Sequence, residues 1–374
     1  MIRIRDLWMT YATAHGHDKG QAAAVRGLSL EIAEGAFYTL LGPSGCGKTT
    51  TLRCVAGLER PESGEIEIAG GTVFSSARGL WVPPYDRNIG MVFQSYAIWP
   101  HMTVFDNIAF PLRYKKPKPS RAETRDCVMA ALSLVRLDGF ENRPAPYLSG
   151  GQQQRLALAR ALVAEPRVLL LDEPLSNLDA KLREEMRLEL REMVERLKVT
   201  TLFVTHEQIE ALTMSDTVAV MKDGVIVQAG SPAAIYGKPA ESFVADFIGK
   251  TNLLRGQVAS LGVSGEGPVA DVTTSIGLLR CRVDAATRAG DALTLTVRPE
   301  HIALSIDGAA GHTDGGNTVV GRVETVIYLG NLLECVVAVG PETLRVQLHP
   351  SAAVTRGADV QLALPIEHCL AMRH

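Results

Sequence analysis

The chain has 374 residues, of which 46% are hydrophobic and 21% charged, and its formal net charge is −3 at pH 7. This balance is typical of a globular protein of roughly two or three domains and excludes a disordered chain. The slightly acidic charge argues against a dedicated nucleic-acid-binding protein. No run of about 18 apolar residues predicts a membrane-spanning helix, and the residues from Met1 to Asp6 carry no signal segment. We therefore expect a cytoplasmic protein.

The first informative element is a buried strand over 37–41, followed by a glycine-rich loop and a helix from Thr49. The loop reads Gly42-Pro43-Ser44-Gly45-Cys46-Gly47-Lys48-Thr49 and fits the pattern G-x-x-x-x-G-K-S/T. In this pattern backbone N–H groups surround a phosphate, the lysine reaches the β- and γ-phosphates, and the hydroxyl holds Mg²⁺. The strand and helix on either side make a chance match improbable, so the loop predicts a nucleotide site. Cys46, beside Lys48 and a helix start, is expected to have a lowered thiol pKa and to be reactive.

A second helix is expected from Ser149 to about Glu165. Ser149 is a natural N-cap, and the glycines that follow it, Gly150 and Gly151, expose backbone N–H groups. Taken alone, this segment is equally a simple cap with a tight turn.

Two carboxylates end the next predicted strand, which covers 168–171. Asp172 is placed to organise Mg²⁺, and Glu173 to orient or deprotonate an attacking water. Capping of the following turn is the alternative role, which the upstream phosphate loop makes the weaker one. An amphipathic helix over 180–198 and a strand over 201–204 complete a βαβ unit.

Near 247–249 the long helical patterns end, and short runs of alternating apolar and polar residues follow, such as 293–297 and 334–339. These runs predict a second, all-β domain, a small barrel. The fold class is therefore an α/β P-loop ATPase core with an α-helical subdomain, followed by a smaller all-β, OB-like domain. We expect domains at 1–245 and 246–374, with the helical subdomain at about 95–165.

The segment Leu148-Ser149-Gly150-Gly151-Gln152, between the phosphate loop and the acidic pair, resembles the signature of ABC-transporter ATPases. The resemblance implies further site residues. Gln94 is similar to the Q-loop glutamine that senses Mg²⁺ and water, Ser176 to Asp179 resembles the D-loop, and His206 resembles the switch histidine that contacts the γ-phosphate. The implied ATP-binding residues are Tyr11, the phosphate loop from Gly42 to Thr50, the signature residues Ser149 to Gln152, and Asp179. Tyr11 is expected to stack on adenine, and Trp8 is the alternative for this role. The implied metal site comprises Thr49, Gln94 and Asp172, and catalysis rests on Glu173, His206, Gln94 and Lys48.

The segment 91–110 resembles the ATPases of bacterial importers, and 247–249, 297–300 and 321–323 resemble landmarks of their TOBE domain. This resemblance implies the cofactors ATP and Mg²⁺, a homodimer with shared sites, membrane permease subunits that dock near 98–102, and an indirect periplasmic binding protein. It places the chain peripherally on the inner face of the plasma membrane, with no nucleic acid as partner. The solute is left open among ferric iron, polyamines, phosphonates and sugars. The alternatives are a soluble ABC ATPase that acts on nucleic acid or the ribosome, and a P-loop kinase, against which the signature and His206 argue.

Overall fold

The computed structural model describes residues 1–12, 21–264, 267–306 and 316–373. They form two compact units, Met1–Ala233 and Ala234–His374. The second unit starts before the boundary that the sequence suggested at 245/246. The reason is that the Arg298 guanidinium donates hydrogen bonds to the carbonyl oxygens of Ala245 at 2.9 Å and Tyr236 at 3.2 Å. Within the described ranges, no helix combines the length and apolar character needed to cross a bilayer.

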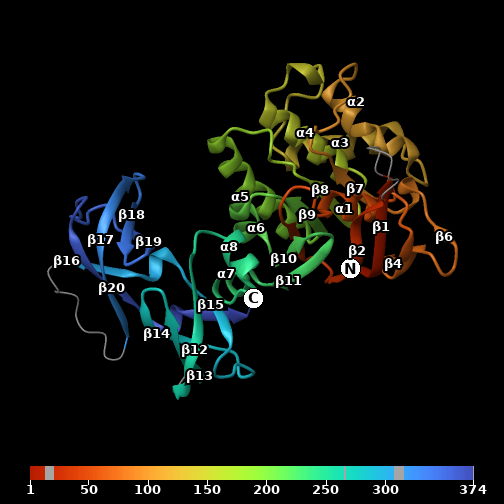
Figure 1. Ribbon diagram of the computed structural model, residues 1–374. Helices are drawn as coiled ribbons and strands as arrows, with labels where there is room; N and C mark the ends of the chain where they lie inside the picture. The colour runs from red at the N-terminus through yellow and green to blue at the C-terminus, as the bar shows by residue number, and fades with distance from the viewer. Residues whose placement is uncertain (13–20, 265–266, 307–315, 374) are drawn as a thin grey trace. The chain divides into compact units, whose positions relative to one another are not determined.

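A six-stranded sheet forms the centre of the first unit (Figure 1), in the order β11-β10-β3-β9-β8-β7. The bounds are Phe37–Leu41 for β3, Ile89–Val92 for β7, Val168–Asp172 for β8, Thr200–Thr205 for β9, Thr217–Lys222 for β10 and Val225–Gly230 for β11. Pairing is parallel except between β10 and β11. β3, β8 and β9 are buried along their whole length, which explains their continuous apolar runs.

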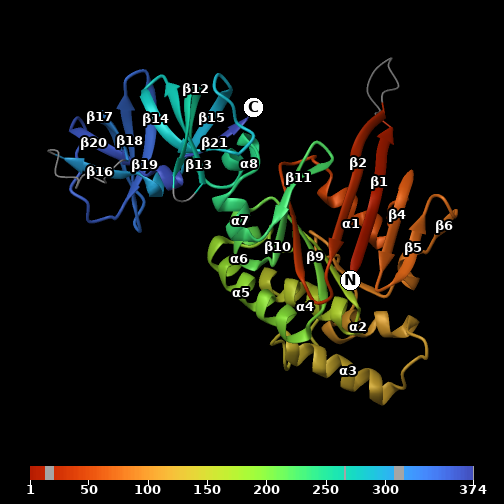
Figure 2. The same cartoon turned by 90° about the horizontal axis from the view of Figure 1, so that it is seen from below.

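Helix α1 (Lys48–Ala56) lies between this sheet and a second, antiparallel sheet, as Figure 2 shows. The antiparallel strands, in the order β2-β1-β4-β5-β6, are Gln21–Ile32, Ile2–Ala12, Ser63–Ile68, Gly71–Ser75 and Leu80–Trp81. Leu52 and Val55 of α1 belong to a core cluster that includes Ile4 of the antiparallel sheet and Leu170 of the central sheet. Burial on both sides therefore fixes α1, and with it the loop that precedes it.

Helices cover the opposite face of the central sheet. They are α2 (Val104–Ala109), α3 (Arg121–Leu134), α4 (Gly150–Leu162), α5 (Ala180–Leu197) and α6 (Gln208–Met214), with the short 3₁₀ turns η2 (Pro111–Tyr114) and η3 (Ala145–Tyr147). The 3₁₀ turn η1 (Pro84–Asp86) is instead followed by Arg87, which donates hydrogen bonds to carbonyl oxygens of α1. Leu156 of α4 and Leu190 of α5 share one core with Phe203 of β9. α4 ends before the predicted limit at Glu165, which has a left-handed φ of 55° that a helix cannot continue.

The second unit begins with two short helices, α7 (Pro232–Gly237), which spans the division between the units, and α8 (Ser242–Phe247). A closed barrel follows with the strand order β12-β13-β14-β21-β15, whose bounds are Asn252–Ser264, Gly267–Thr274, Gly277–Arg282, Leu370–Arg373 and Ala292–Val297. A further sheet has the order β16-β20-β17-β18-β19, with bounds Ala303–Ile306, Asp359–Leu364, Asn317–Tyr328, Leu333–Val339 and Glu342–Leu348. The 3₁₀ turns η4 (Pro299–His301) and η5 (Ile366–His368) complete the unit. Leu293 of the barrel and Val337 of the further sheet belong to one core, so the expected single small barrel is only half of this unit.

Candidate active site

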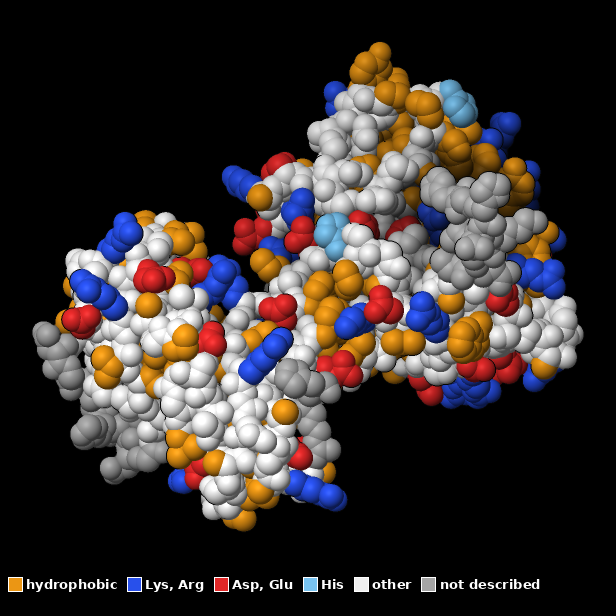
Figure 3. Space-filling model, viewed as in Figure 1, with side chains coloured by type: hydrophobic (Ala, Val, Ile, Leu, Met, Phe, Trp, Pro, Cys, Tyr) orange, Lys and Arg blue, Asp and Glu red, His pale blue; other side chains and the backbone are white. Residues whose placement is uncertain are grey.

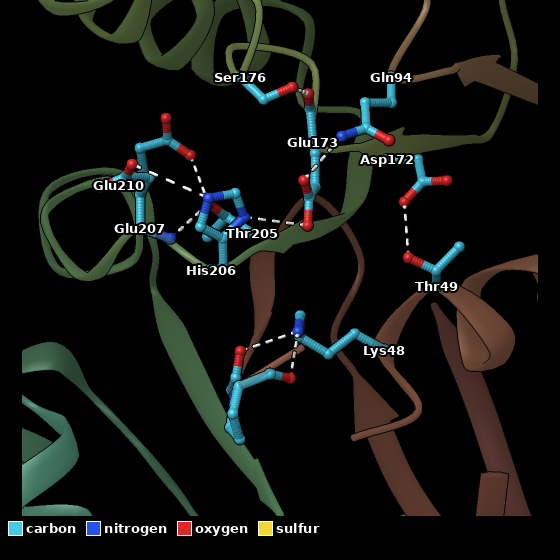
Figure 4. A network of polar contacts seen from close by, with 12 residues as sticks. Lys48, Thr49, Gln94, Asp172, Glu173, Ser176, Thr205, His206, Glu207 and Glu210 are labelled. Carbon is cyan, nitrogen blue, oxygen red and sulfur yellow. Dashed lines mark hydrogen bonds and ion pairs between the residues drawn. The ribbon is translucent and has the colours of Figure 1, made fainter. Parts of the chain in front are cut away.

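Four groups of the expected site residues follow neighbouring strands of the central sheet. The phosphate loop follows β3, Gln94 follows β7, Glu173 follows β8 and His206 follows β9. Because β3, β9, β8 and β7 are parallel neighbours, their carboxyl ends meet at one edge of the sheet, where ligands bind in open α/β folds. Figure 4 shows these side chains turned toward one another at that edge.

The phosphate loop has the tight curvature that its glycines allow. Gly47 has a φ of 100°, and a Cβ at this position would lie 2.2 Å from the carbonyl oxygen of Ala24. No other residue fits there. The buried Lys48 Nζ donates to the carbonyl oxygens of Gly42 at 2.8 Å and Pro43 at 3.0 Å, so the ammonium group lies within the curve of the loop. Pro43, Ser44 and Gly45 are exposed.

Thr49 and Asp172 come from different elements and meet. The Thr49 hydroxyl donates to Asp172 Oδ1 at 3.0 Å. Burial raises the pKa of Asp172 above its ordinary value, which the Thr49 hydrogen bond and Arg53 partly oppose. A hydroxyl and a carboxylate are hard oxygen donors of the kind that Mg²⁺ prefers, and a buried carboxylate gains most from a nearby cation. The donor set therefore fits the magnesium ion that accompanies ATP.

Glu173 lies between two predicted partners. Gln94 Nε2 donates to Glu173 Oε2 at 3.1 Å, and His206 Nδ1 lies 3.1 Å from Glu173 Oε1 (Figure 4). The side chain of Glu173 is only 18% exposed, whereas that of His206 is 47% exposed. A carboxylate held from both sides, with little freedom to rotate, suits a group that orients one water molecule.

The expectation of a reactive Cys46 is contradicted. Its side chain is 3% exposed, and burial raises the pKa of the thiol, although Lys48 acts in the lowering direction. The Lys48 Nζ lies 3.8 Å from Cys46 Sγ but is shared with two carbonyl oxygens. Desolvation of the thiolate therefore outweighs the neighbouring charge, and Cys46 is a packing residue of the loop.

Tyr11 and Trp8 lie in different surroundings. The Tyr11 hydroxyl is 3.5 Å from Thr50 Oγ1 at the start of α1, and the side chain is 38% exposed. The Trp8 indole instead donates to Asp6 Oδ1 at 2.9 Å, and it packs beside Gly27. This placement favours Tyr11 as the aromatic beside the phosphate loop. Of the long segment that follows Tyr11, residues 13–20 lie outside the described part of the chain.

The signature segment starts α4 as a capping box. Ser149 Oγ accepts from the backbone N–H of Gln152 at 3.5 Å, and Gln152 Oε1 accepts from the N–H of Ser149 at 3.0 Å. In the D-loop, Asp179 Oδ1 accepts from the N–H of Leu182 at 3.0 Å and so caps α5. Both segments have local hydrogen bonds that fix them, and no hydrogen bond among the described residues joins either to the phosphate loop.

Two supporting contacts were missed by sequence reasoning. Asn177 Nδ2 donates to the backbone oxygen of Gln94 at 2.7 Å, which ties the Q-loop to the D-loop. Thr205 Oγ1 donates to Glu210 Oε2 at 2.5 Å and accepts from the N–H of Glu207 at 3.0 Å, which fixes the chain around His206. Glu210 is 3% exposed, and burial raises its pKa. No sequence signal marks it, since a glutamate in a helix is ordinarily exposed.

The chain is similar to known proteins along most of its length. A family model described as ABC transporter matches residues 25–176, and a TOBE domain model matches 295–372. The spermidine/putrescine import ATP-binding protein PotA of Rubrobacter xylanophilus is 46% identical over 94% of this chain and 90% of that protein. The Fe(3+) ions import ATP-binding protein FbpC of Agrobacterium fabrum is 47% identical over 84% of this chain and 83% of that protein.

Among solved structures, the dimeric structure of the bacterial ABC transporter cassette MJ0796 is similar to this chain. The TM-score is 0.54 at 31% sequence identity, and the match covers 62% of this chain and 99% of that one.

Proposed function

We propose a function from the premise that this chain belongs to the ABC transporter family, as an ATP-hydrolysing, ATP-binding subunit of an importer with a C-terminal TOBE domain. We infer that it binds MgATP, dimerises around it on the cytoplasmic face of the membrane, and drives solute import through separate permease subunits. The observation that carries this inference is the position of Glu173, held between Gln94 and His206 at the sheet edge where the phosphate loop begins.

The geometry suggests how the residues divide the reaction. Lys48 and the loop N–H groups would hold the β- and γ-phosphates, and Thr49 and Asp172 would hold Mg²⁺, which neutralises charge on the transferred phosphoryl group. Glu173 would accept a proton from water as the water oxygen bonds to the γ-phosphorus and the bond to the leaving ADP breaks. His206, on the other side of this carboxylate, would donate a hydrogen bond to the γ-phosphate and keep Glu173 in place.

A contact with a permease is supported by the segment that follows Gln94. Trp99 is fixed by Phe110, with ring centroids 4.3 Å apart, and by the Arg160 guanidinium 4.6 Å above its ring. Arg160 also donates to the carbonyl oxygens of Tyr96 and Ala97, at 2.7 Å and 2.6 Å. A rigid partner surface placed next to Gln94 would let the permease and the hydrolytic water influence each other.

The solute class is proposed from the relatives that match over most of both chains. Their names refer to spermidine and putrescine or to ferric ions, so we propose a polyamine or ferric ion importer with a periplasmic binding protein as a further partner. The Thermococcus litoralis relative named for trehalose and maltose covers only 66% of this chain, which makes a sugar the weaker candidate. Solute-stimulated ATPase activity of the reconstituted complex tests this choice.

Affinity purification from detergent-solubilised membranes tests the function as a whole. We expect an integral membrane permease to copurify with the chain, and Lys48→Ala to keep the permease but lose ATP hydrolysis. Copurification of ribosomes or nucleic acid without a permease would instead support a soluble ABC ATPase.

A further inference from the structure

An open groove of about 790 Å³ lies between α3 on one side and α2 with η2 on the other, within the first unit. Its apolar lining consists of Phe105, Ala109, Leu112, Pro119 and Ala122, its cations are Arg113, Lys118, Arg121 and Arg125, and Asp106 and Thr124 complete it. We call these eleven residues the basic groove. It lies apart from the nucleotide site and has no role in the proposed hydrolysis.

The cations of the basic groove are largely unneutralised. Only Arg113 has a carboxylate partner, Asp106 at 3.5 Å. Lys118, Arg121 and Arg125 are exposed, and their side chains make no hydrogen bond or ion pair with any residue that the structure describes. Charges of one sign with low-dielectric walls focus an electrostatic field that attracts anions.

The one nearby carboxylate within the segment 113–125 has another function. Glu123 Oε2 accepts from the backbone N–H of Ser120 at 2.7 Å, in the capping box that starts α3. Ser120 and its hydrogen bonds hold the pKa of Glu123 below its ordinary value, so this carboxylate stays ionised as a cap. Lys116, in the connection from η2 to α3, is a further exposed cation, whereas Lys115 lies 3.9 Å from the carboxylate of Glu165.

The apolar lining restricts the kind of anion that fits. Leu112 and Ala109 are buried beneath the groove, at 1% and 4% exposed, whereas Phe105 and Pro119 are half-buried and Ala122 is exposed. The apolar surface open to a ligand therefore comes from these last three side chains. A nucleic acid backbone or an inorganic ion would use the cations but leave the apolar surface of these three side chains in water. An acidic phospholipid carries a phosphate and glyceryl and acyl carbons in one molecule, and it matches both parts.

A chain of aromatic contacts leads from the groove toward the proposed permease contact. The ring centroid of Phe110 lies 4.3 Å from that of Trp99 and 5.5 Å from that of Tyr114. Tyr114 is 72% exposed. Exposed aromatic rings beside lysine and arginine are typical of surfaces at the membrane–water interface. In Figure 3 hydrophobic side chains, with Lys and Arg beside them, gather on the upper part of the first unit, over the helical region.

We propose that the basic groove binds the headgroup of an anionic phospholipid in the bilayer that holds the permease. The placement next to a membrane rests on the proposed function, whereas the affinity for acidic lipid is a property of this chain alone. Contact with lipid would orient the helical region toward the permease and add to its docking.

Flotation of the full-length protein with vesicles tests the proposal. We expect binding to vesicles of phosphatidylcholine mixed with phosphatidylglycerol, weakened by salt, and little binding to phosphatidylcholine alone. Lys118→Glu with Arg121→Glu should weaken binding at least about tenfold, because each basic side chain near an anionic surface contributes appreciably. The matched control is Arg255→Glu with Arg356→Glu, which changes the charge equally at exposed sites of the second unit and should float like the wild type.

The outcomes separate this proposal from the proposed function. The groove variant should keep wild-type ATPase activity and unfolding temperature, and Lys48→Ala should float normally without hydrolysing ATP. Equal flotation of the groove and control variants, equal binding to neutral vesicles, or preferential binding to polyglutamate over acidic vesicles would overturn the lipid site. Failure of flotation in a protein that still hydrolyses ATP and copurifies with a permease would remove only this inference.

Discussion

Among single residues, Glu173 has the most constrained conformation in the site. Its φ is 46°, in the left-handed region that a glutamate rarely adopts. Its N–H donates to the carbonyl oxygen of Val204 at 3.0 Å, and its own carbonyl accepts from Ser176 Oγ at 2.9 Å. These bonds hold a backbone geometry that costs on the order of 1–3 kcal/mol. The strain turns the carboxylate toward Gln94 and His206.

Replacement of Glu173 by Gln should leave ATP binding intact and slow hydrolysis at least about a hundredfold, because the amide cannot accept the proton of the attacking water. The measurement is phosphate release in the purified protein, with gel filtration to detect a persistent ATP-bound dimer. Glu241→Gln, at an exposed position in the second unit, serves as the control. Wild-type turnover in Glu173→Gln would end the assignment of Glu173 as the base.

Asp172→Asn should raise the stability of the nucleotide-free protein while it removes Mg²⁺-dependent hydrolysis by at least about a hundredfold. Burial raises the pKa of Asp172 in the folded state above the ordinary value of 3.8. The protonated carboxyl therefore favours the folded state below pH 3.8, and this contribution to stability is lost as the pH rises through the folded-state pKa. At pH 7 Asn is neutral, so it avoids the cost of burying an ionised carboxylate. Thermal unfolding at pH 7 and pH 4 checks this, and the gain should shrink at the lower pH.

Asp216→Asn is the opposite control. Partial burial acts to raise the pKa of Asp216, but hydrogen bonds from Arg191 and Phe37 outweigh it and lower the pKa. Its stabilisation is present above about pH 4 and lost as pH falls further. Asp216→Asn should therefore lower the unfolding temperature at pH 7. If the unfolding temperature falls for both variants, burial of the ionised Asp172 does not destabilise the folded protein.

At the scale of elements, α3 and α4 begin in the same way. Each has a serine N-cap and a reciprocal capping box, Ser120 with Glu123 and Ser149 with Gln152. The two caps can therefore be compared directly, because only the cap of α4 is expected to bind ATP. The N-terminus of α4 presents free N–H groups to an anion, which the signature resemblance assigns to the γ-phosphate of a partner's nucleotide.

Ser120→Ala and Ser149→Ala should each destabilise the protein by about 1 kcal/mol, the usual loss for an N-cap. Only Ser149→Ala should also weaken ATP-dependent dimerisation and hydrolysis. Urea unfolding gives the first quantity, and ATPase rates with gel filtration give the second. Equal ATPase rates in the two variants would reduce Ser149 to a structural cap.

For the whole molecule, the division into two units decides where the chain can be cut. A chain that stops near Gly249 keeps α8, whose buried Val244 and Ala245 would be exposed without the barrel. The Arg298 bonds to the carbonyl oxygens of Ala245 and Lys250 would also be lost. A chain that stops after Ser231, where β11 has ended, retains the complete central sheet.

We expect the chain ending at Ser231 to bind ATP with near wild-type affinity, because the nucleotide motifs end at His206. The chain ending at Gly249 should bind equally but aggregate more readily. Calorimetric ATP titration and light scattering check these expectations. Absence of ATP binding in a folded 1–231 chain would mean that the second unit is needed for the site.

A mixed dimer tests whether sites are shared between subunits. Lys48→Ala and Gly151→Asp should each be inactive alone, the second because a carboxylate would oppose the γ-phosphate. A mixed dimer contains one Lys48→Ala subunit and one Gly151→Asp subunit. If each site is built from both subunits, one site carries both changes and the other carries neither, and the unchanged site should bind ATP and restore some hydrolysis. Differently tagged dimers permit this measurement, and ATP cross-linking detects the intact site if coupling silences turnover. If neither binding nor turnover returns, the sites are not shared.

The sequence by itself determined the elements that carry the chemistry. Glycine spacing, apolar runs and caps are local properties, so the strand over 37–41, the loop before Lys48, the helix after Ser149 and the acidic end of the strand at Asp172 were predicted with nearly correct bounds. The family resemblance then supplied Gln94 and His206, which no local pattern marks.

Only the tertiary structure decided which side chains meet and how deeply they are buried. The order of strands β3-β9-β8-β7 places Glu173 between Gln94 and His206, and strand order depends on long-range pairing. Burial also reversed the expectation for Cys46, because desolvation depends on all the atoms around the thiol and outweighs one neighbouring charge. The basic groove likewise exists only because α2 and α3 fold side by side and bring the apolar lining and the cations together.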